Sequence, residues 1–130
     1  MKEYNLPDDL QYSKEHVWLR RDGAVGSIGI SDFAQARLDD VAYVDLPQVG
    51  AEFAAGAEFG TVESIKAVNA LYMPIAGKVL EVNSALSDTP TLVNADPYAR
   101  GWMIKISIPE NADQSLLLSA AEYRKGLENS

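Results

Sequence analysis

Short apolar segments recur along this chain, and turn-forming residues separate them. Hydrophobic and polar residues alternate within the segments, which is the pattern of strands that bury one face. Glycine, proline and aspartate between the segments supply the geometry of tight turns. The expected strands are residues 17–19, 24–30, 41–46, 59–62, 67–73, 78–82 and 102–108. The pattern therefore predicts a mainly β fold built from short strands.

Two segments predict helices beside these strands. Ser31 is a favourable N-cap residue, and Asp32 would lie in the first turn of the helix that follows it. Near the C-terminus, Ser119 can cap a second helix over residues 120–125, with Gly126 as its stop signal. We therefore expect short flanking helices, one of them C-terminal.

The size and composition of the chain are those of one globular domain. It has 130 residues, of which 47% are hydrophobic and 23% are charged. A domain of this size buries roughly two-thirds of the surface that its unfolded chain would expose, so it needs no disulfide or metal for stability. We expect residues 1–130 to form a single domain in which residues 83–97 make a long connection, and such connections are often functional.

The chemistry open to the chain is limited by its lack of cysteine and its single histidine, His16. These residues cannot form a cysteine–histidine zinc site, a thiol nucleophile or an iron–sulfur cluster. We expect His16 to pack beside Trp18, since an acid–base role would need a positioned substrate and partner. No nucleophile–base pair is recognisable, so the sequence argues against an autonomous enzyme, and redox chemistry would require a cofactor.

The charge pattern restricts the expected partners. Six carboxylates but no lysine or arginine occur between residues 38 and 65, in a chain of net charge -8: Asp39, Asp40, Asp45, Glu52, Glu58 and Glu63. This charge disfavours nucleic acid and acidic membranes and favours partners with basic docking surfaces, although it could also serve only solubility. No apolar run approaches membrane-spanning length, and residues 1–10 resemble no targeting signal, so we expect a cytoplasmic protein.

One lysine, Lys66, stands between two strand-like runs at the end of the acidic segment. A lysine that carries an amide-linked group must project from a rigid turn so that other enzymes can reach it, and a hairpin tip meets this requirement. Glu63 and Ser64 would offer polar contacts to a modifying enzyme. Spacing alone still favours an ordinary solvated lysine, because short motifs often match by chance.

The segment around this lysine, residues 60–83, resembles the lipoyl-lysine hairpin of glycine cleavage system H proteins. Four more blocks resemble the same family in the same order: residues 12–18 (YSKEHVW), 29–35 (GISDFAQ), 41–47 (VAYVDLP) and 92–103 (LVNADPYARGWM). The resemblance covers nearly the whole chain. It implies a barrel-sandwich hybrid fold like that of lipoyl and biotinyl domains, in which Gly77 matches the turn glycine of lipoyl domains.

The resemblance also implies a function without an active site in this chain. Lipoate would be attached covalently to Lys66, with Glu63 and Ser64 recognised by the lipoate-attaching enzymes. The arm would carry an aminomethyl group from a pyridoxal-phosphate glycine decarboxylase to a tetrahydrofolate-dependent aminomethyltransferase. Dihydrolipoyl dehydrogenase would then reoxidise the arm. In such a carrier the cofactor supplies the chemistry, and the protein supplies position and electrostatics.

Two positions depart from the family pattern. Val17 stands where H proteins commonly have a glutamate, and Arg37 stands near a position where some relatives have histidine. If Val17 lies in a strand that includes Glu15, the two side chains share a face, so Glu15 could replace the missing carboxylate. Both departures concern the cleft that would shelter the loaded arm, and we expect weaker protection of that arm from water.

Three other functions can be weighed against the glycine cleavage carrier. A relay protein that passes octanoyl or lipoyl groups to other proteins would use the same Lys66. An unmodified paralogue that only docks on partner enzymes is less compatible with the lysine's retained surroundings. A biotin carrier is disfavoured, because Ile65 and Ala67 occupy the positions where biotin carriers usually have methionine. The sequence leaves the relay and the paralogue open.

Overall fold

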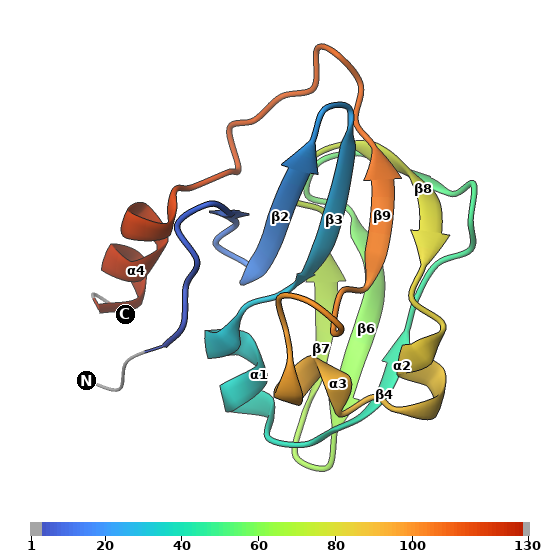
Figure 1. Ribbon diagram of the computed structural model, residues 1–130, viewed down its shortest axis with the longest axis vertical. Coiled ribbons are helices and arrows are strands. Elements are labelled where there is room, and N and C mark those ends of the chain that lie inside the picture. Colours follow the sequence, from blue (N-terminus) through green and yellow to red (C-terminus); the bar gives the residue numbers. More distant parts are fainter. Residues whose placement is uncertain (1–3, 129–130) are drawn as a thin grey trace.

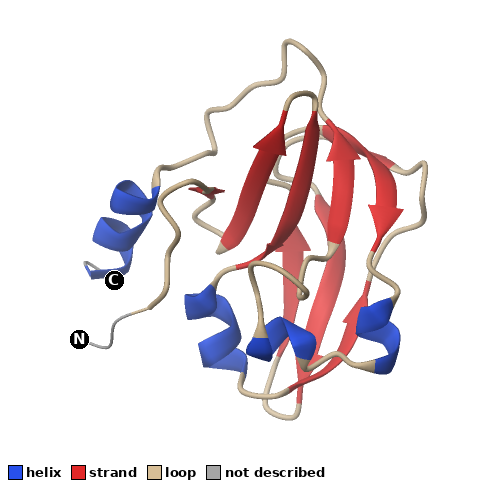
Figure 2. Cartoon of the chain, viewed as in Figure 1, coloured by secondary structure: helices blue, strands red, loops and turns tan. Residues whose placement is uncertain are grey.

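The computed structural model describes residues 4–128, which form two β-sheets and four short helices (Figures 1 and 2). The strands are β1 (Gln11–Tyr12), β2 (Val17–Asp22), β3 (Val25–Ile30), β4 (Val41–Asp45), β5 (Glu52–Phe53), β6 (Glu58–Ser64), β7 (Val68–Tyr72), β8 (Gly77–Val82) and β9 (Ile104–Ser107). The helices are α1 (Asp32–Leu38), α2 (Ala85–Asp88), α3 (Leu92–Ala95) and α4 (Ala120–Glu128). None of the helices within the described residues is long and apolar enough to cross a membrane.

Neighbouring strands are antiparallel throughout both sheets. The larger sheet has the order β1-β2-β3-β9-β8-β5, and the smaller has the order β4-β6-β7. One hydrophobic cluster joins them, with Ile28 and Ile106 from the larger sheet and Val62 and Leu71 from the smaller. Burial of each such side chain contributes about 1.5–3 kcal/mol. The predicted mainly β architecture is confirmed.

The β6–β7 hairpin reaches the end of the molecule where three helices gather. Figure 1 shows α1, α2 and α3 at the same end of the sheets as this hairpin tip, whereas α4 lies apart, beside the N-terminal segment. Helices α1 and α3 also contact each other. The hairpin tip therefore lies at the same end of the molecule as the turn that follows α1, which contacts it through Asp39 and Lys66.

The seven predicted strands are present, and the structure adds elements that the sequence pattern missed. Strands β1 and β5 have two residues each, which is too short for alternation to be visible. The segment expected to be one long connection, residues 83–97, contains α2 and α3. Each has four residues, about one turn, so no helical periodicity can show in the sequence.

Both predicted helices exist, but the end of the second was wrong. The Ser31 hydroxyl accepts a bond from the Ala34 backbone N–H, as expected of an N-cap. The Glu122 N–H donates to Ser119 Oγ, and the Ser119 N–H donates to the Glu122 carboxylate, which forms a capping box. Helix α4 does not stop at Gly126. It continues because Leu127, beyond the glycine, packs into a hydrophobic cluster that holds the helix in place.

His16 connects α4 to the start of α1 and does not pack beside Trp18 as predicted. Its Nδ1 lies 2.7 Å from the Tyr123 hydroxyl, which lies 2.7 Å from Ser31 Oγ. Its ring packs 4.9 Å from that of Phe33, whereas Trp18 packs against Tyr98. The backbone of His16 has a positive φ of 71°, which turns the side chain away from the direction that a continuous strand would give it.

The pH dependence of stability should carry a signature of His16. Burial lowers the pKa of His16, and the nearby Arg37 lowers it further, while Glu15 acts in the opposite direction. Around its ordinary pKa of about 6.5, and below it until the folded histidine is protonated too, the unfolded chain binds more protons than the folded one, so stability falls as the pH drops below about 7. We expect urea midpoints to fall more steeply over this range in the wild type than in His16→Asn, since asparagine tolerates a positive φ and does not titrate. Equal slopes would contradict this assignment.

Gly77 is required by close strand packing, and its replacement should destabilise the fold. It is the first residue of β8, and an added Cβ would lie 2.9 Å from the Ser107 carbonyl oxygen and 2.7 Å from Ile106 Cδ1. We expect Gly77→Ala to lower the free energy of unfolding by about 1–3 kcal/mol in urea titrations. The matched control is Gly126→Ala in α4, where a Cβ meets no atom within 4 Å and should add about 0.5–1 kcal/mol. Similar effects of the two substitutions would show that packing does not determine the cost.

Candidate functional site

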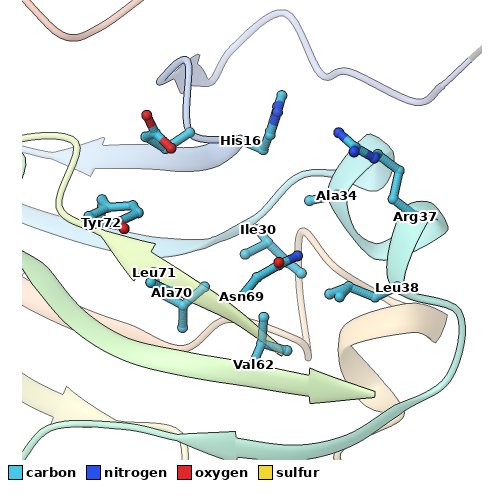
Figure 3. Close-up of a pocket in the computed structure, with 11 residues that line it drawn as sticks. His16, Ile30, Ala34, Arg37, Leu38, Val62, Asn69, Ala70, Leu71 and Tyr72 are labelled. Atoms are coloured by element: carbon cyan, nitrogen blue, oxygen red, sulfur yellow. The ribbon is translucent and has the colours of Figure 1, made fainter. Parts of the chain in front are cut away.

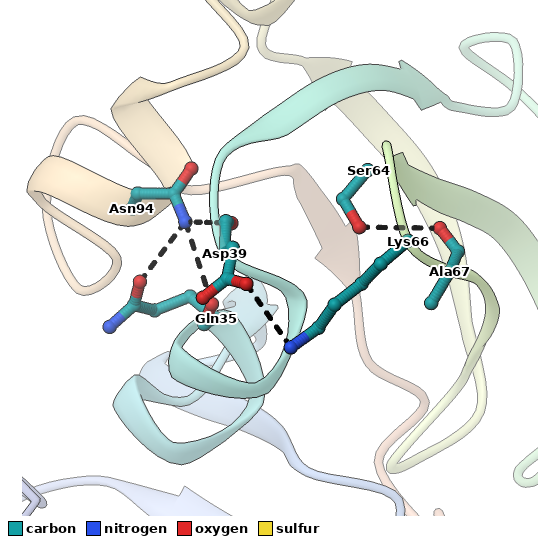
Figure 4. Close-up of polar contacts among 6 residues, drawn as sticks. All are labelled: Gln35, Asp39, Ser64, Lys66, Ala67 and Asn94. Carbon is teal, nitrogen blue, oxygen red and sulfur yellow. Dashed lines mark hydrogen bonds and ion pairs between the residues drawn. The ribbon is translucent and has the colours of Figure 1, made fainter.

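Lys66 lies at the tip of the β6–β7 hairpin, as the sequence predicts. Strand β6 ends at Ser64 and β7 begins at Val68, which leaves a three-residue connection. The Ser64 N–H donates to the Ala67 carbonyl oxygen at 2.8 Å, and the Ser64 hydroxyl lies 3.5 Å from the same oxygen. Figure 4 shows this contact closing the tip. The closed turn fixes the backbone from which the lysine side chain projects.

The side chains around the tip differ widely in exposure. Ile65 is fully exposed, and 56% of the Lys66 side chain is exposed. Glu63 is half-buried, whereas Ser64 is only 7% exposed. An approaching enzyme can therefore reach Ile65, the lysine amine and part of Glu63. Ser64 contributes chiefly by shaping the turn through its bond to Ala67.

The lysine amine has an acidic partner that sequence reasoning missed. Lys66 Nζ lies 3.1 Å from Oδ2 of Asp39, the residue that ends α1 (Figure 4). Both side chains are more than half exposed, so the ion pair itself is worth about 0–1 kcal/mol. Asp39 was visible in the sequence only as one carboxylate of an acidic segment. No sequence pattern indicated that the turn after α1 lies against the hairpin tip.

Asn94, from α3, fixes the backbone of this turn on both sides of Asp40. Its Nδ2 donates to the Asp39 carbonyl oxygen at 2.6 Å, and its Oδ1 accepts from the Val41 N–H at 2.8 Å. The same Nδ2 lies 3.1 Å from Gln35 Oε1 (Figure 4). The segment of residues 83–97, expected to be a functional connection, therefore supplies a clamp for the turn beside Lys66.

A cavity of about 310 Å³ lies between the start of β2, helix α1 and strand β7 (Figure 3). Four of its lining residues are polar or charged, namely Glu15, His16, Arg37 and Asn69. The apolar lining consists of Ile30, Ala34, Leu38, Val62, Ala70 and Leu71, with Tyr72 beside them. Leu38 also lines a second hollow, of about 270 Å³, that includes Ile65 and Lys66. Leu38 is thus the residue that the cavity shares with the hollow beside the lysine.

The two residues that depart from the family pattern have different positions. Val17 is 1% exposed and belongs to the hydrophobic core, and it is absent from the cavity lining. The expectation that Glu15 and Val17 share a strand face is wrong, because β2 begins at Val17 and Glu15 lies in the preceding turn. Glu15 nevertheless lines the cavity, as does Arg37. The cavity therefore has one carboxylate and one guanidinium, together with His16, whose pKa is lowered chiefly by burial.

A Val17→Glu substitution is consequently a poor test of the cavity. In this chain it would place a carboxylate among the apolar side chains that pack around Val17, so a change in stability would accompany any change in the cavity. Changes at Glu15 and Arg37 alter the charge of the cavity and leave the core intact.

The sequence and the fold of this chain both match those of known proteins of one family. The family model for the glycine cleavage H-protein matches residues 10–130. Glycine cleavage system H proteins from Carboxydothermus hydrogenoformans and Anaeromyxobacter sp. are 52% and 50% identical over 123 residues; these alignments cover 95% of this chain and 95% and 96% of the relatives. A crystal structure of a glycine cleavage system H protein from Mycobacterium marinum matches with a TM-score of 0.82 at 34% identity, covering 94% of this chain and 98% of that one. Together with the lysine-tipped hairpin, these matches show that the chain belongs to the glycine cleavage H-protein family.

Proposed function

We propose that Lys66 is the attachment site for lipoate and that the chain acts through it as the shuttle of the glycine cleavage system. Members of this family are carriers and not catalysts, so the functional requirement is an accessible amine on a rigid support. The observation that carries the proposal is the closed tip between Ser64 and Ala67, which presents Lys66 beside a fully exposed Ile65. Bound lipoate would supply a disulfide that can accept a one-carbon unit and be reduced.

Several enzymes would visit this one site. We propose a pyridoxal-phosphate glycine decarboxylase, a tetrahydrofolate-dependent aminomethyltransferase, dihydrolipoyl dehydrogenase and the lipoate-attaching enzymes as partners. The exposed tip supports this, because a group on Lys66 can be reached without opening the fold. The net charge of -8 would favour partners with basic docking surfaces. Residues 1–130 would act as one carrier domain, and the absence of cysteine is compatible with the reducing cytoplasm, where we place it.

The cavity beside the hairpin is the proposed shelter for the loaded arm. It has apolar walls for a hydrocarbon chain, and Glu15 is a carboxylate acceptor for a terminal amine. Arg37 lies in the same lining and would repel a cationic amine. Arg37 in the lining therefore supports the expectation of weaker protection. The expectation that Val17 also belongs to the cleft is wrong, because this side chain is buried in the core and does not line the cavity.

The attachment site can be tested by intact mass measurement and peptide mapping of protein purified from its native host. We expect a lipoyl adduct on Lys66 and its complete loss in Lys66→Arg, which keeps the charge but does not accept an amide-linked acyl group. Lys78→Arg, on the exposed side of β8, is the control and should keep the adduct. An octanoyl adduct on Lys66 would favour the relay function. An unmodified Lys66 in cells that lipoylate other proteins would exclude both functions.

The proposed shelter can be tested by the rate at which aminomethyl-loaded protein releases its one-carbon unit to water. We expect Glu15→Gln to accelerate release by about two- to tenfold, because it removes a charged hydrogen-bond acceptor. Arg37→Gln should slow release, because it removes a like charge. Glu58→Gln, an exposed carboxylate on β6 outside the cavity, is the control for net charge. If both cavity variants release at the wild-type rate, the loaded arm does not use this cavity.

A further inference from the structure

Asp39 has a backbone conformation that is costly for any residue other than glycine. Its φ is 60° and its ψ is -151°, a region that side chains with a Cβ rarely enter. Among residues 4–128, His16 is the only other non-glycine residue with positive φ. Such strain persists only where the surroundings impose it, and it often marks a functional position.

The surroundings impose it here through a neighbouring helix. Both side-chain groups of Asn94 bond to the turn, one to the Asp39 carbonyl and one to the Val41 N–H. These bonds fix the backbone on either side of Asp40. The strained turn therefore gives the Asp39 carboxylate a defined direction, and that direction is toward Lys66 Nζ, 3.1 Å away.

We propose that Asp39 is a positioning residue that tethers the unmodified ε-ammonium of Lys66 and releases this side chain once that nitrogen is acylated. This inference rests on the proposed role of Lys66. In acylation the nitrogen forms an amide bond with the carbonyl carbon of an activated acyl group, supplied by the attaching enzyme as an acyl-adenylate or thioester. The bond to the leaving group breaks, one proton departs with that group and one goes to solvent. The product is neutral, so its attraction to Asp39 is lost.

The tether affects two steps. The ion pair must open before the nitrogen can attack an acyl group, so Asp39 slows the modification while it holds the amine in the hollow by the tip. After acylation nothing of opposite charge retains the side chain there. The arm can then pass Leu38, which lines both that hollow and the cavity beyond it.

The first measurement is the octanoylation rate of unmodified protein by a purified lipoate–protein ligase with octanoate and ATP. We expect kcat/KM to rise about two- to fivefold in Asp39→Asn, which is the range for loss of an exposed ion pair. The gain should shrink in 0.5 M salt, since screening weakens the pair in the wild type. Asp40→Asn is the matched control, because it removes the same charge from the adjacent exposed residue; within residues 4–128 Asp40 forms no ion pair. If kcat/KM rose equally in both variants, the gain would come from the change in net charge, and the proposed tether would be overturned.

The second measurement is the order of the Lys66 side-chain methylene groups from ¹³C relaxation. We expect octanoylation to lower their order parameters in the wild type, and unmodified Asp39→Asn to show the lowered values already. Matching spectra elsewhere in the two proteins verify that the variant is folded. If ligase attaches no octanoate to Lys66, the proposed function fails and this inference fails with it. If Lys66 is octanoylated but neither the rates nor the order parameters respond to Asp39→Asn, the inference alone is overturned.

Discussion

The register of β6 between its two neighbours determines the geometry of the site. Glu63 pairs with Tyr43 on one side and with Val68 on the other, so the strand is fixed from both edges. Its alternation buries Val62 in the core, and a slip of one residue would exchange the buried and exposed faces. Gly60 enforces the fit, because a Cβ there would collide with the Asp45 carbonyl oxygen. The lysine reaches the tip only because this register is held.

A rigid support and an accessible amine are opposing demands on the same hairpin, and the sequence of the tip meets both. The backbone N–H and the hydroxyl of Ser64 bond to the Ala67 carbonyl oxygen, whereas the Ile65 side chain is fully exposed to solvent. An exposed isoleucine gains nothing for the folded monomer. Its position beside Lys66 is consistent with a surface that other proteins contact.

The strands and the lysine hairpin could be predicted from sequence because their signals are local. Alternation over five to seven residues, and turn residues on either side, suffice to place β6 and β7. The contacts that define the site are not local. Asp39, Asn94 and Lys66 lie in three separate segments, and their meeting depends on how α1 and α3 pack at the end of the sheets. The turn at Glu15 depends on the positive φ of His16, which no alternation pattern reveals.

In the proposed carrier, the charged group that faces the arm would differ between the unmodified lysine and the loaded arm. Before modification the lysine is a cation and its nearest charged group is the Asp39 carboxylate. After modification the attachment point would be neutral, and a charge would appear at the far end only when the arm carries an amine; the carboxylate facing that amine would then be Glu15 in the cavity. Arg37 would weaken this second attraction and not the first, because it lines the cavity and not the hollow at the tip. In the proposed carrier, substitutions in the cavity would therefore change how long cargo is retained and would leave the attachment at Lys66 unaltered.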